Sequence, residues 1–159
     1  NSPMGYSFPA AIGSAIQSSD RQIICFTGDG SMQMNIQELQ TMSHHRLPIK
    51  LFILNNFGYG IIKQFQDTWF EGRHEASGKG YSQPDFEKIA DAYNISYRKI
   101  SNPEDIIKED LDSKEGIIFD VILHPNTLIE PKIDSGNPLH NMSPYLDLDS
   151  DSLEKKYLK

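Results

Sequence analysis

The sequence predicts an α/β fold, in which a mainly parallel sheet is covered by helices on both faces to give three layers. Two observations support this class. Strand-like apolar runs alternate with helix-like segments along the chain, and the runs do not switch between polar and apolar residues as half-exposed strands do. With 159 residues of ordinary globular composition, the chain is long enough for one substantial core.

The first half of the chain shows the order helix, strand, helix, strand. Apolar residues recur at helical spacing before and after a short β-branched and aromatic run, and Gly28 and Gly30 mark the turn after that run. Both apolar runs are expected to be strands buried on both faces. The expected elements are a helix over 8–19, a strand over 21–27, a helical pattern continuing to Ser43 and a strand over 48–56.

The second half continues the alternation after a long irregular segment. We expect residues 66–84, rich in glycine, serine and charge, to form a long loop that is functional or mobile. After it we expect a helix over 84–94, a strand over 95–100, a helix over 103–111 and a strand over 116–123.

The chain is expected to divide into an α/β domain and an arm. Residues 1–125 hold the alternating pattern, and residues 126–159 are rich in proline, asparagine and aspartate without a clear period. This composition predicts an extended arm with a polar, acidic tail, of which the last ten or so residues are loosely ordered.

Charge and cysteine content limit the function classes. The formal charge of −7 and the pI near 5.1 argue against nucleic acid or an anionic membrane as the main partner. The apolar runs are far shorter than a membrane-spanning helix. The single cysteine, Cys25, cannot form an internal disulfide, and a reducing cytoplasm is the expected location.

The tight turn at residues 28–31, "GDGS", follows the first expected strand and precedes a helix. Ligands of parallel sheets bind beyond the carboxyl ends of strands, where glycines let the backbone approach a phosphate. Asp29 would repel a phosphate unless a divalent cation lay between them. On its own, however, this tripeptide pattern is more typical of an ordinary turn.

A second strand end makes the ligand interpretation stronger. The strand over 48–56 ends in Asn55 and Asn56, and Gly58 and Gly60 follow. Twenty-four residues separate Gly30 from Asn55, which is the length of one helix and one returning strand. Both strand ends should therefore face one crevice, where Asn56 and a turn carbonyl can join Asp29 around a cation.

These two motifs and their spacing resemble the cofactor-binding motif of thiamine diphosphate (ThDP) enzymes. The surrounding sequence is similar to the C-terminal, diphosphate-binding domain of the acetolactate synthase-like branch, which includes pyruvate oxidase and several 2-oxoacid decarboxylases. The likeness extends from residue 1 to about residue 125, and it is carried by the motifs and by residues 2–15, 47–62 and 83–95.

The resemblance implies roles for individual residues. The side chains of Asp29 and Asn56 and the carbonyl of Gly58 would bind Mg²⁺. Met4 would lie beneath the cofactor and bend it, so that the pyrimidine amino group approaches the thiazolium ring, with the carbonyl of Ser2 as the partner of that amino group. Residues that would bind or line the diphosphate are Gly28, Gly30, Ser31, Tyr59 and Gly60.

The resemblance also implies partners beyond these residues. In the family, a glutamate that activates the aminopyrimidine lies in an N-terminal domain of a neighbouring subunit, and no residue here matches it. We therefore expect an excised domain or the small partner of a split enzyme, inactive alone, that works in a homo-oligomer (dimer or tetramer) on a small 2-oxoacid. Acetolactate synthases commonly have a tryptophan where this chain has Phe65, so their acceptor specificity is not implied.

Three interpretations of function remain open. The chain can be the cofactor-binding half of an enzyme that decarboxylates a 2-oxoacid and transfers the acyl carbanion equivalent. It can instead be a noncatalytic ThDP- and Mg²⁺-binding module or regulatory partner. The third, a phosphate-ester enzyme with Asp29 as nucleophile, is disfavoured because the acids or lysine that such an aspartate needs do not occur around residues 28–32.

Overall fold

The computed structural model describes residues 3–18, 21–133, 137 and 142–143. The chain divides into two compact units, Asn1–Thr127 and Leu128–Lys159. In the second unit, β6 (Lys132–Ile133) pairs with the antiparallel strand β7 (Met142–Ser143). The tail that we expect to be loosely ordered lies outside the described residues.

The first unit is built on a four-stranded parallel sheet of order β1-β2-β5-β4. The expected α/β class with a mainly parallel sheet is thereby confirmed, and each strand lies within two residues of its predicted bounds. The strands are β1 (Ile23–Gly28), β2 (Ile49–Asn55), β4 (Ser96–Ile100) and β5 (Ile117–Ile122).

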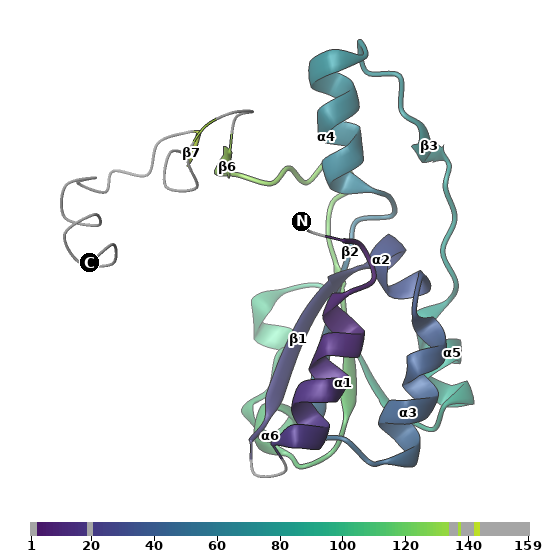
Figure 1. Ribbon diagram of the computed structural model, residues 1–159, viewed down its shortest axis with the longest axis vertical. Helices are drawn as coiled ribbons and strands as arrows, with labels where there is room; N and C mark the ends of the chain where they lie inside the picture. The colour runs from purple at the N-terminus through teal and green to yellow at the C-terminus, as the bar shows by residue number, and fades with distance from the viewer. Residues whose placement is uncertain (1–2, 19–20, 134–136, 138–141, 144–159) are drawn as a thin grey trace, which may run out of the picture. The chain divides into compact units, whose positions relative to one another are not determined.

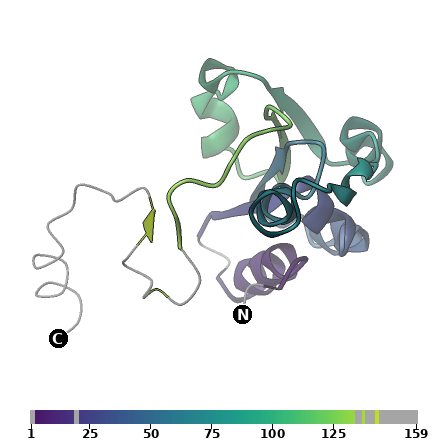
Figure 2. The same cartoon turned by 90° about the horizontal axis from the view of Figure 1, so that it is seen from above.

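Helices cover both faces of the sheet (Figures 1 and 2). On one face, α1 (Ser7–Gln17), α3 (Leu39–His44) and α5 (Phe86–Ala92) pack in one apolar cluster with alternate residues of β2. On the other face, the segment containing α6 (Lys108–Asp112) packs against Phe52 and Phe119. No helix in the described part of the chain is long and apolar enough to cross a membrane.

Two expected helices are interrupted by side chains that bond to the backbone. The first is divided into α2 (Asp29–Gln33), a 3₁₀ turn (Ile36–Glu38) and α3, because Asn35 leaves the helical conformation and donates to the Gly5 carbonyl.

The helix expected over 103–111 is also divided. A 3₁₀ turn at Pro103–Asp105 precedes α6, and the Asp105 carboxylate accepts from the backbone N–H groups of Ser101 and Asn102. Such local bonds satisfy backbone donors without a continuous helix.

The expectation of a loop over residues 66–84 is wrong in part. Helix α4 (Gly60–Trp69) continues into this range, and β3 (Glu75–Gly80) follows it. The helix ends where Glu71 and Gly72 adopt positive φ angles, and the N–H groups of Phe70 and Gly72 bond to the Gln66 carbonyl. Figure 1 shows β3 beside α4.

Strand β1 is less buried than expected. Ile24 and Phe26 are 53% and 59% exposed, so one face of this terminal strand is uncovered in the described structure, whereas five consecutive residues of β2 from Ile49 are buried. The apolar cluster on this face is built by β2, β4, β5 and the segment around α6, and it contains no residue of β1.

A stack of aromatic rings crosses the sheet and generates a stability prediction. Phe52 stacks on Phe119 with ring centroids 4.5 Å apart and on Phe26 at 5.1 Å. Phe119 is fully buried, so Phe119→Ala should lower the free energy of unfolding by about 3–5 kcal/mol in urea titrations. Phe26→Ala, at the exposed end of the same stack, should cost about 1 kcal/mol or less. Equal losses would contradict this packing.

Candidate functional site

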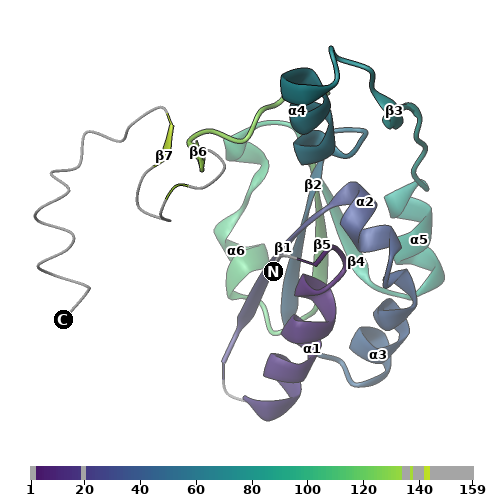
Figure 3. The ribbon, with the colours of Figure 1, turned by 45° about the horizontal axis from the view of Figure 1, so that its top comes forward.

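The site begins with two strand ends that the fold places at one edge of the sheet. Strand β1 ends at Gly28 and leads directly into α2, and β2 ends at Asn55, five residues before α4 begins. The two strands are parallel neighbours, with Gly28 opposite Leu54. Figures 1 and 3 show α2 and α4 beyond the same end of the sheet.

A hydrogen bond joins the two predicted motifs. The backbone N–H of Gly58 donates to Oδ2 of Asp29 at 3.1 Å, and the hydroxyl of Tyr81 donates to the same oxygen at 2.9 Å. Asp29 is only 1% exposed although it is the first residue of a helix. The structure thus brings Asp29 and Gly58 together, as the spacing of the motifs predicts.

The environment of Asp29 favours a cationic ligand. Burial raises the pKa of its carboxyl, and hydrogen bonds from Tyr81 and from the backbone of Gly30 and Gly58 oppose that rise. Among the described residues, no lysine, arginine or histidine forms an ion pair with it. A buried carboxylate that has hydrogen-bond donors but no countercharge fits a divalent cation.

Asn56 and Gly58 are the other predicted metal ligands, and both lie in the turn after β2. Phe57 between them has a φ of +58°, a left-handed conformation that costs a non-glycine residue about 1–3 kcal/mol. Asn56 is half-buried with its side-chain amide against Gly60, and no hydrogen bond joins it to Asp29 among the described residues.

The predicted metal ligands are one carboxylate, one side-chain amide and one backbone carbonyl, so they contain only one charged group. No group of three or more His, Cys, Asp and Glu side chains among the described residues could hold a metal ion. The predicted ligands belong to the hard oxygen type that Mg²⁺ prefers, with water and phosphate completing its coordination.

The predicted diphosphate residues surround the same edge. At Gly28 a Cβ atom would meet nothing within 4 Å, whereas at Gly30 it would overlap the ring of Tyr59, so a larger residue there would displace that ring. The Ser31 hydroxyl accepts from the Gly5 N–H at 2.7 Å, which leaves its own O–H as a donor. Gly60 is the first residue of α4.

Met4 and Ser2 belong to the segment before α1. Met4 is 40% exposed and therefore is not an ordinary core methionine. It precedes Gly5, which Ser31 and Asn35 hold against the segment that follows β1, so Met4 lies near the predicted crevice. Ser2 lies outside the described residues, and its predicted role is not addressed by the structure.

Tyr81 is a site residue that sequence reasoning missed. Its hydroxyl accepts from Gln33 at 3.0 Å while it donates to Asp29, and its ring lies edge-on to Tyr59 with centroids 4.9 Å apart. Burial and the nearby Asp29 charge raise the pKa of Tyr81, so the hydroxyl remains a donor at neutral pH. The sequence pointed to Tyr81 only through the expectation that residues 66–84 are functional or mobile.

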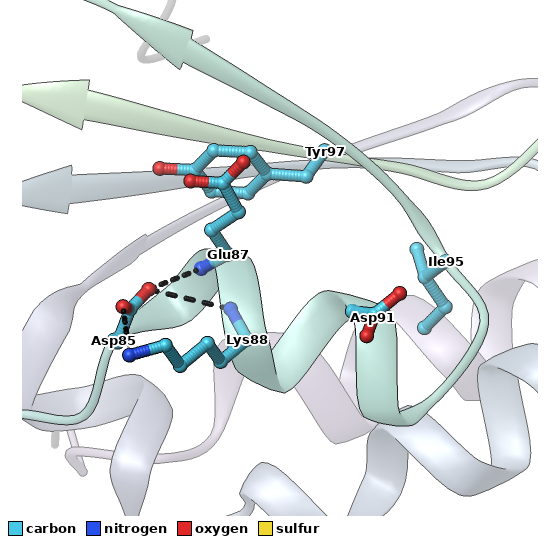
Figure 4. A pocket seen from close by; sticks show the side chains of 6 residues that line it. All are labelled: Asp85, Glu87, Lys88, Asp91, Ile95 and Tyr97. Atoms are coloured by element: carbon cyan, nitrogen blue, oxygen red, sulfur yellow. Dashed lines mark hydrogen bonds and ion pairs between the residues drawn. The ribbon is translucent and has the colours of Figure 1, made fainter.

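A pocket with mainly acidic lining lies away from the strand ends. Figure 4 shows this pocket of about 470 Å³ beside α5, where Asp85, Glu87 and Asp91 dominate the lining with Lys88, Ile95 and Tyr97. Asp85 already accepts from the N–H groups of Glu87 and Lys88 as the helix cap. None of the predicted cofactor residues that the structure describes lines this pocket.

Comparisons with known proteins agree with this arrangement. Residues 1–119 match the family described as "Thiamine pyrophosphate enzyme, C-terminal TPP binding domain". The acetolactate synthase large subunit of Cyanidium caldarium is 36% identical over 136 residues, which cover 84% of this chain and 23% of that protein. That of Buchnera aphidicola subsp. Schlechtendalia chinensis is 43% identical over 106 residues, which cover 67% and 18%.

A solved structure shows the same fold. The thiamine diphosphate-dependent 4-hydroxybenzoylformate decarboxylase of Rhodococcus jostii RHA1 superposes with a TM-score of 0.69 and 27% identity, over 76% of this chain and 23% of that one. The chain thus spans about a quarter or less of the length of these relatives. On these matches and the fold, the chain belongs to the thiamine pyrophosphate enzyme family, as a C-terminal ThDP-binding domain of the acetolactate synthase and pyruvate oxidase type.

Proposed function

We propose that this chain binds Mg²⁺ and the diphosphate of ThDP at the adjoining ends of β1 and β2, as part of an enzyme that acts on a small 2-oxoacid. The observation that carries the proposal is the hydrogen bond from the Gly58 N–H to the Asp29 carboxylate. This bond joins two motifs that lie far apart in the sequence, which supports a shared role for them.

The residues present can hold the cation and the diphosphate. Asp29 and Asn56 supply side-chain oxygens, and Gly58 supplies its carbonyl. The glycine turn and the Ser31 hydroxyl supply hydrogen-bond donors at the start of α2, where a phosphate is favoured. Gly30 admits Tyr59 closely enough for the two strand-end turns to meet.

When bound, ThDP supplies the carbanion chemistry, and the role of this chain is to hold and shape it. The half-exposed side chain of Met4 is available to support the bend between the cofactor rings. We assign no activating glutamate to these residues and infer that a pyrimidine-binding domain provides it. The 159 residues alone are therefore inferred to be inactive.

The relatives guide the rest of the proposal. We infer decarboxylation of a 2-oxoacid with transfer of the acyl carbanion equivalent, in a cytoplasmic homo-oligomer. The similarity to acetolactate synthase large subunits supports the donor class. Phe65, 54% exposed on α4, occupies the position where acetolactate synthases commonly have tryptophan, so we propose no acceptor.

The metal assignment predicts the behaviour of two variants. Asp29→Ala and Asn56→Ala should each weaken Mg²⁺-dependent ThDP binding by about a hundredfold or more, because loss of a direct ligand should cost at least as much as loss of an outer partner. Calorimetric titration of the complete enzyme measures the affinity, and circular dichroism checks the fold.

Asp91→Ala is the matched control, since it removes an exposed carboxylate from α5, away from the predicted cofactor residues. This variant should bind ThDP and Mg²⁺ like the wild type. Unchanged affinity in both Asp29→Ala and Asn56→Ala would refute the metal assignment.

The pKa of Asp29 predicts a second effect in the absence of metal. Because burial raises its folded pKa above the ordinary 3.8, the contribution of Asp29 to stability is fully present below that pH and is lost as the pH rises through the folded pKa. At pH 7 in EDTA, Asp29→Asn should therefore melt a few degrees higher than the wild type, and the gain should shrink toward pH 4.

The second half of this test measures the Tm of the complete enzyme with Mg²⁺ and ThDP added. The cofactors should raise the Tm of the wild type and leave that of Asp29→Asn nearly unchanged. A metal-free Asp29→Asn variant less stable than the wild type at pH 7 would show that the buried charge already has its compensation within the protein.

A further inference from the structure

A buried polar network lies behind the second cofactor motif. Asp120 on β5 is 6% exposed, and both of its carboxylate oxygens accept hydrogen bonds. Asn55 donates through Nδ2 to Oδ1 at 2.9 Å, and the Tyr97 hydroxyl donates to Oδ2 at 3.0 Å. None of the ion pairs in the described part of the chain involves Asp120, so hydrogen bonds alone satisfy this carboxylate.

The carboxylate fixes the direction of the Asn55 amide. A carboxylate offers only acceptors, so the amide must turn its NH₂ group toward Asp120 and its oxygen away. That oxygen, Oδ1, faces the N–H of Phe57 at 3.4 Å. If the Asn55 amide turned over, its NH₂ group would face the backbone N–H of Phe57, and two donors would oppose each other.

The orientation of Asn55 matters because Phe57 is the strained central residue of the Asn56–Gly58 turn, which carries two predicted metal ligands. Phe57 has the left-handed φ of +58°, which needs support from its surroundings. The next residue, Gly58, directs its N–H to Asp29 and would offer its carbonyl to the cation. A chain of hydrogen bonds thus extends from β4 through β5 and β2 to the cofactor turn.

We propose that Asp120, supported by Tyr97, is a positioning residue that orients Asn55 and thereby holds the Asn56–Gly58 turn ready for Mg²⁺ and ThDP. This inference rests on the proposed function. It extends that function to residues that neither belong to the predicted ligand set nor touch Asp29.

The backbone allows the positioning role to be separated from folding. The carbonyl of Asn55 accepts from the N–H of Leu123 at 2.8 Å, and β2 pairs with β5 along its length. These bonds do not depend on the side chain of Asp120. Loss of the carboxylate should therefore keep the sheet register while it frees the Asn55 amide to turn.

The test measures Mg²⁺-dependent ThDP affinity of the complete enzyme by calorimetry, together with its thermal stability. Asp120→Ala should raise the dissociation constant about tenfold, the low end of the effect of removing a partner of a metal ligand, because Asp120 acts on the turn only through Asn55. Asp120→Asn should keep more affinity than Asp120→Ala, because its amide oxygen can still accept from Asn55 while its NH₂ group donates to the Tyr97 hydroxyl. Tyr97→Phe, which removes one hydroxyl, should give a severalfold rise.

Asp110→Ala is the matched control. Asp110 is also a buried acid, 8% exposed, but it pairs with Arg98 at 2.6 and 3.0 Å and forms no hydrogen bond with Asn55 or Asp120 in the described structure. Arg98 reaches Tyr97 only at its backbone carbonyl, not at the hydroxyl that Asp120 accepts from. This variant should lose stability and keep its ThDP affinity. If Asp120→Ala does not fold, the affinity of Tyr97→Phe decides the matter.

Two results would overturn the inference. One is wild-type affinity in folded Asp120→Ala, or in Tyr97→Phe when only that variant folds. The other is an equal loss of affinity in Asp110→Ala. A wild-type enzyme that binds neither ThDP nor Mg²⁺ would instead refute the proposed function, so the two failures are distinguishable.

Discussion

The parallel pairing of β1 with β2 is the constraint on which the site depends. Their register sets Gly28 opposite Leu54, so each strand ends at the same edge and each following turn begins there. The buried residues of β2 and the aromatic stack through Phe52 hold this register. Hydrophobic packing along the two strands thus sets the positions of the turns that follow them.

Burial and hydrogen bonding determine what two buried carboxylates, Asp29 and Asp120, can do. Asp29 is excluded from water at the start of α2 and accepts from Gly58 and Tyr81, which leaves a desolvated carboxylate without a cationic partner among the described residues. In the proposed function, a divalent cation would supply the missing charge and join the carboxylate to a diphosphate. Asp120 shows the contrasting case, because its carboxylate is satisfied by Asn55 and Tyr97 and serves to fix geometry.

Sequence patterns could predict the sheet and the meeting of the two motifs because both depend on short-range regularities. The apolar runs, the glycines and the spacing from Gly30 to Asn55 indicate parallel strands that return to one edge. The sequence did not predict that the helix after Gly28 is interrupted, because the side chain of Asn35 bonds to the distant backbone of Gly5. The contact of Tyr81 with Asp29 spans 52 residues and leaves no periodic signal.

Diffraction from crystals of the complete enzyme with Mn²⁺ and ThDP would test the central claim most directly. Mn²⁺ takes the same oxygen ligands as Mg²⁺ and gives an anomalous signal that locates it. We predict one anomalous peak within coordination distance of the Asp29 carboxylate, the Asn56 side-chain oxygen and the Gly58 carbonyl, with the diphosphate on its far side. A ThDP-bound structure whose cation lies away from Asp29 would contradict the account.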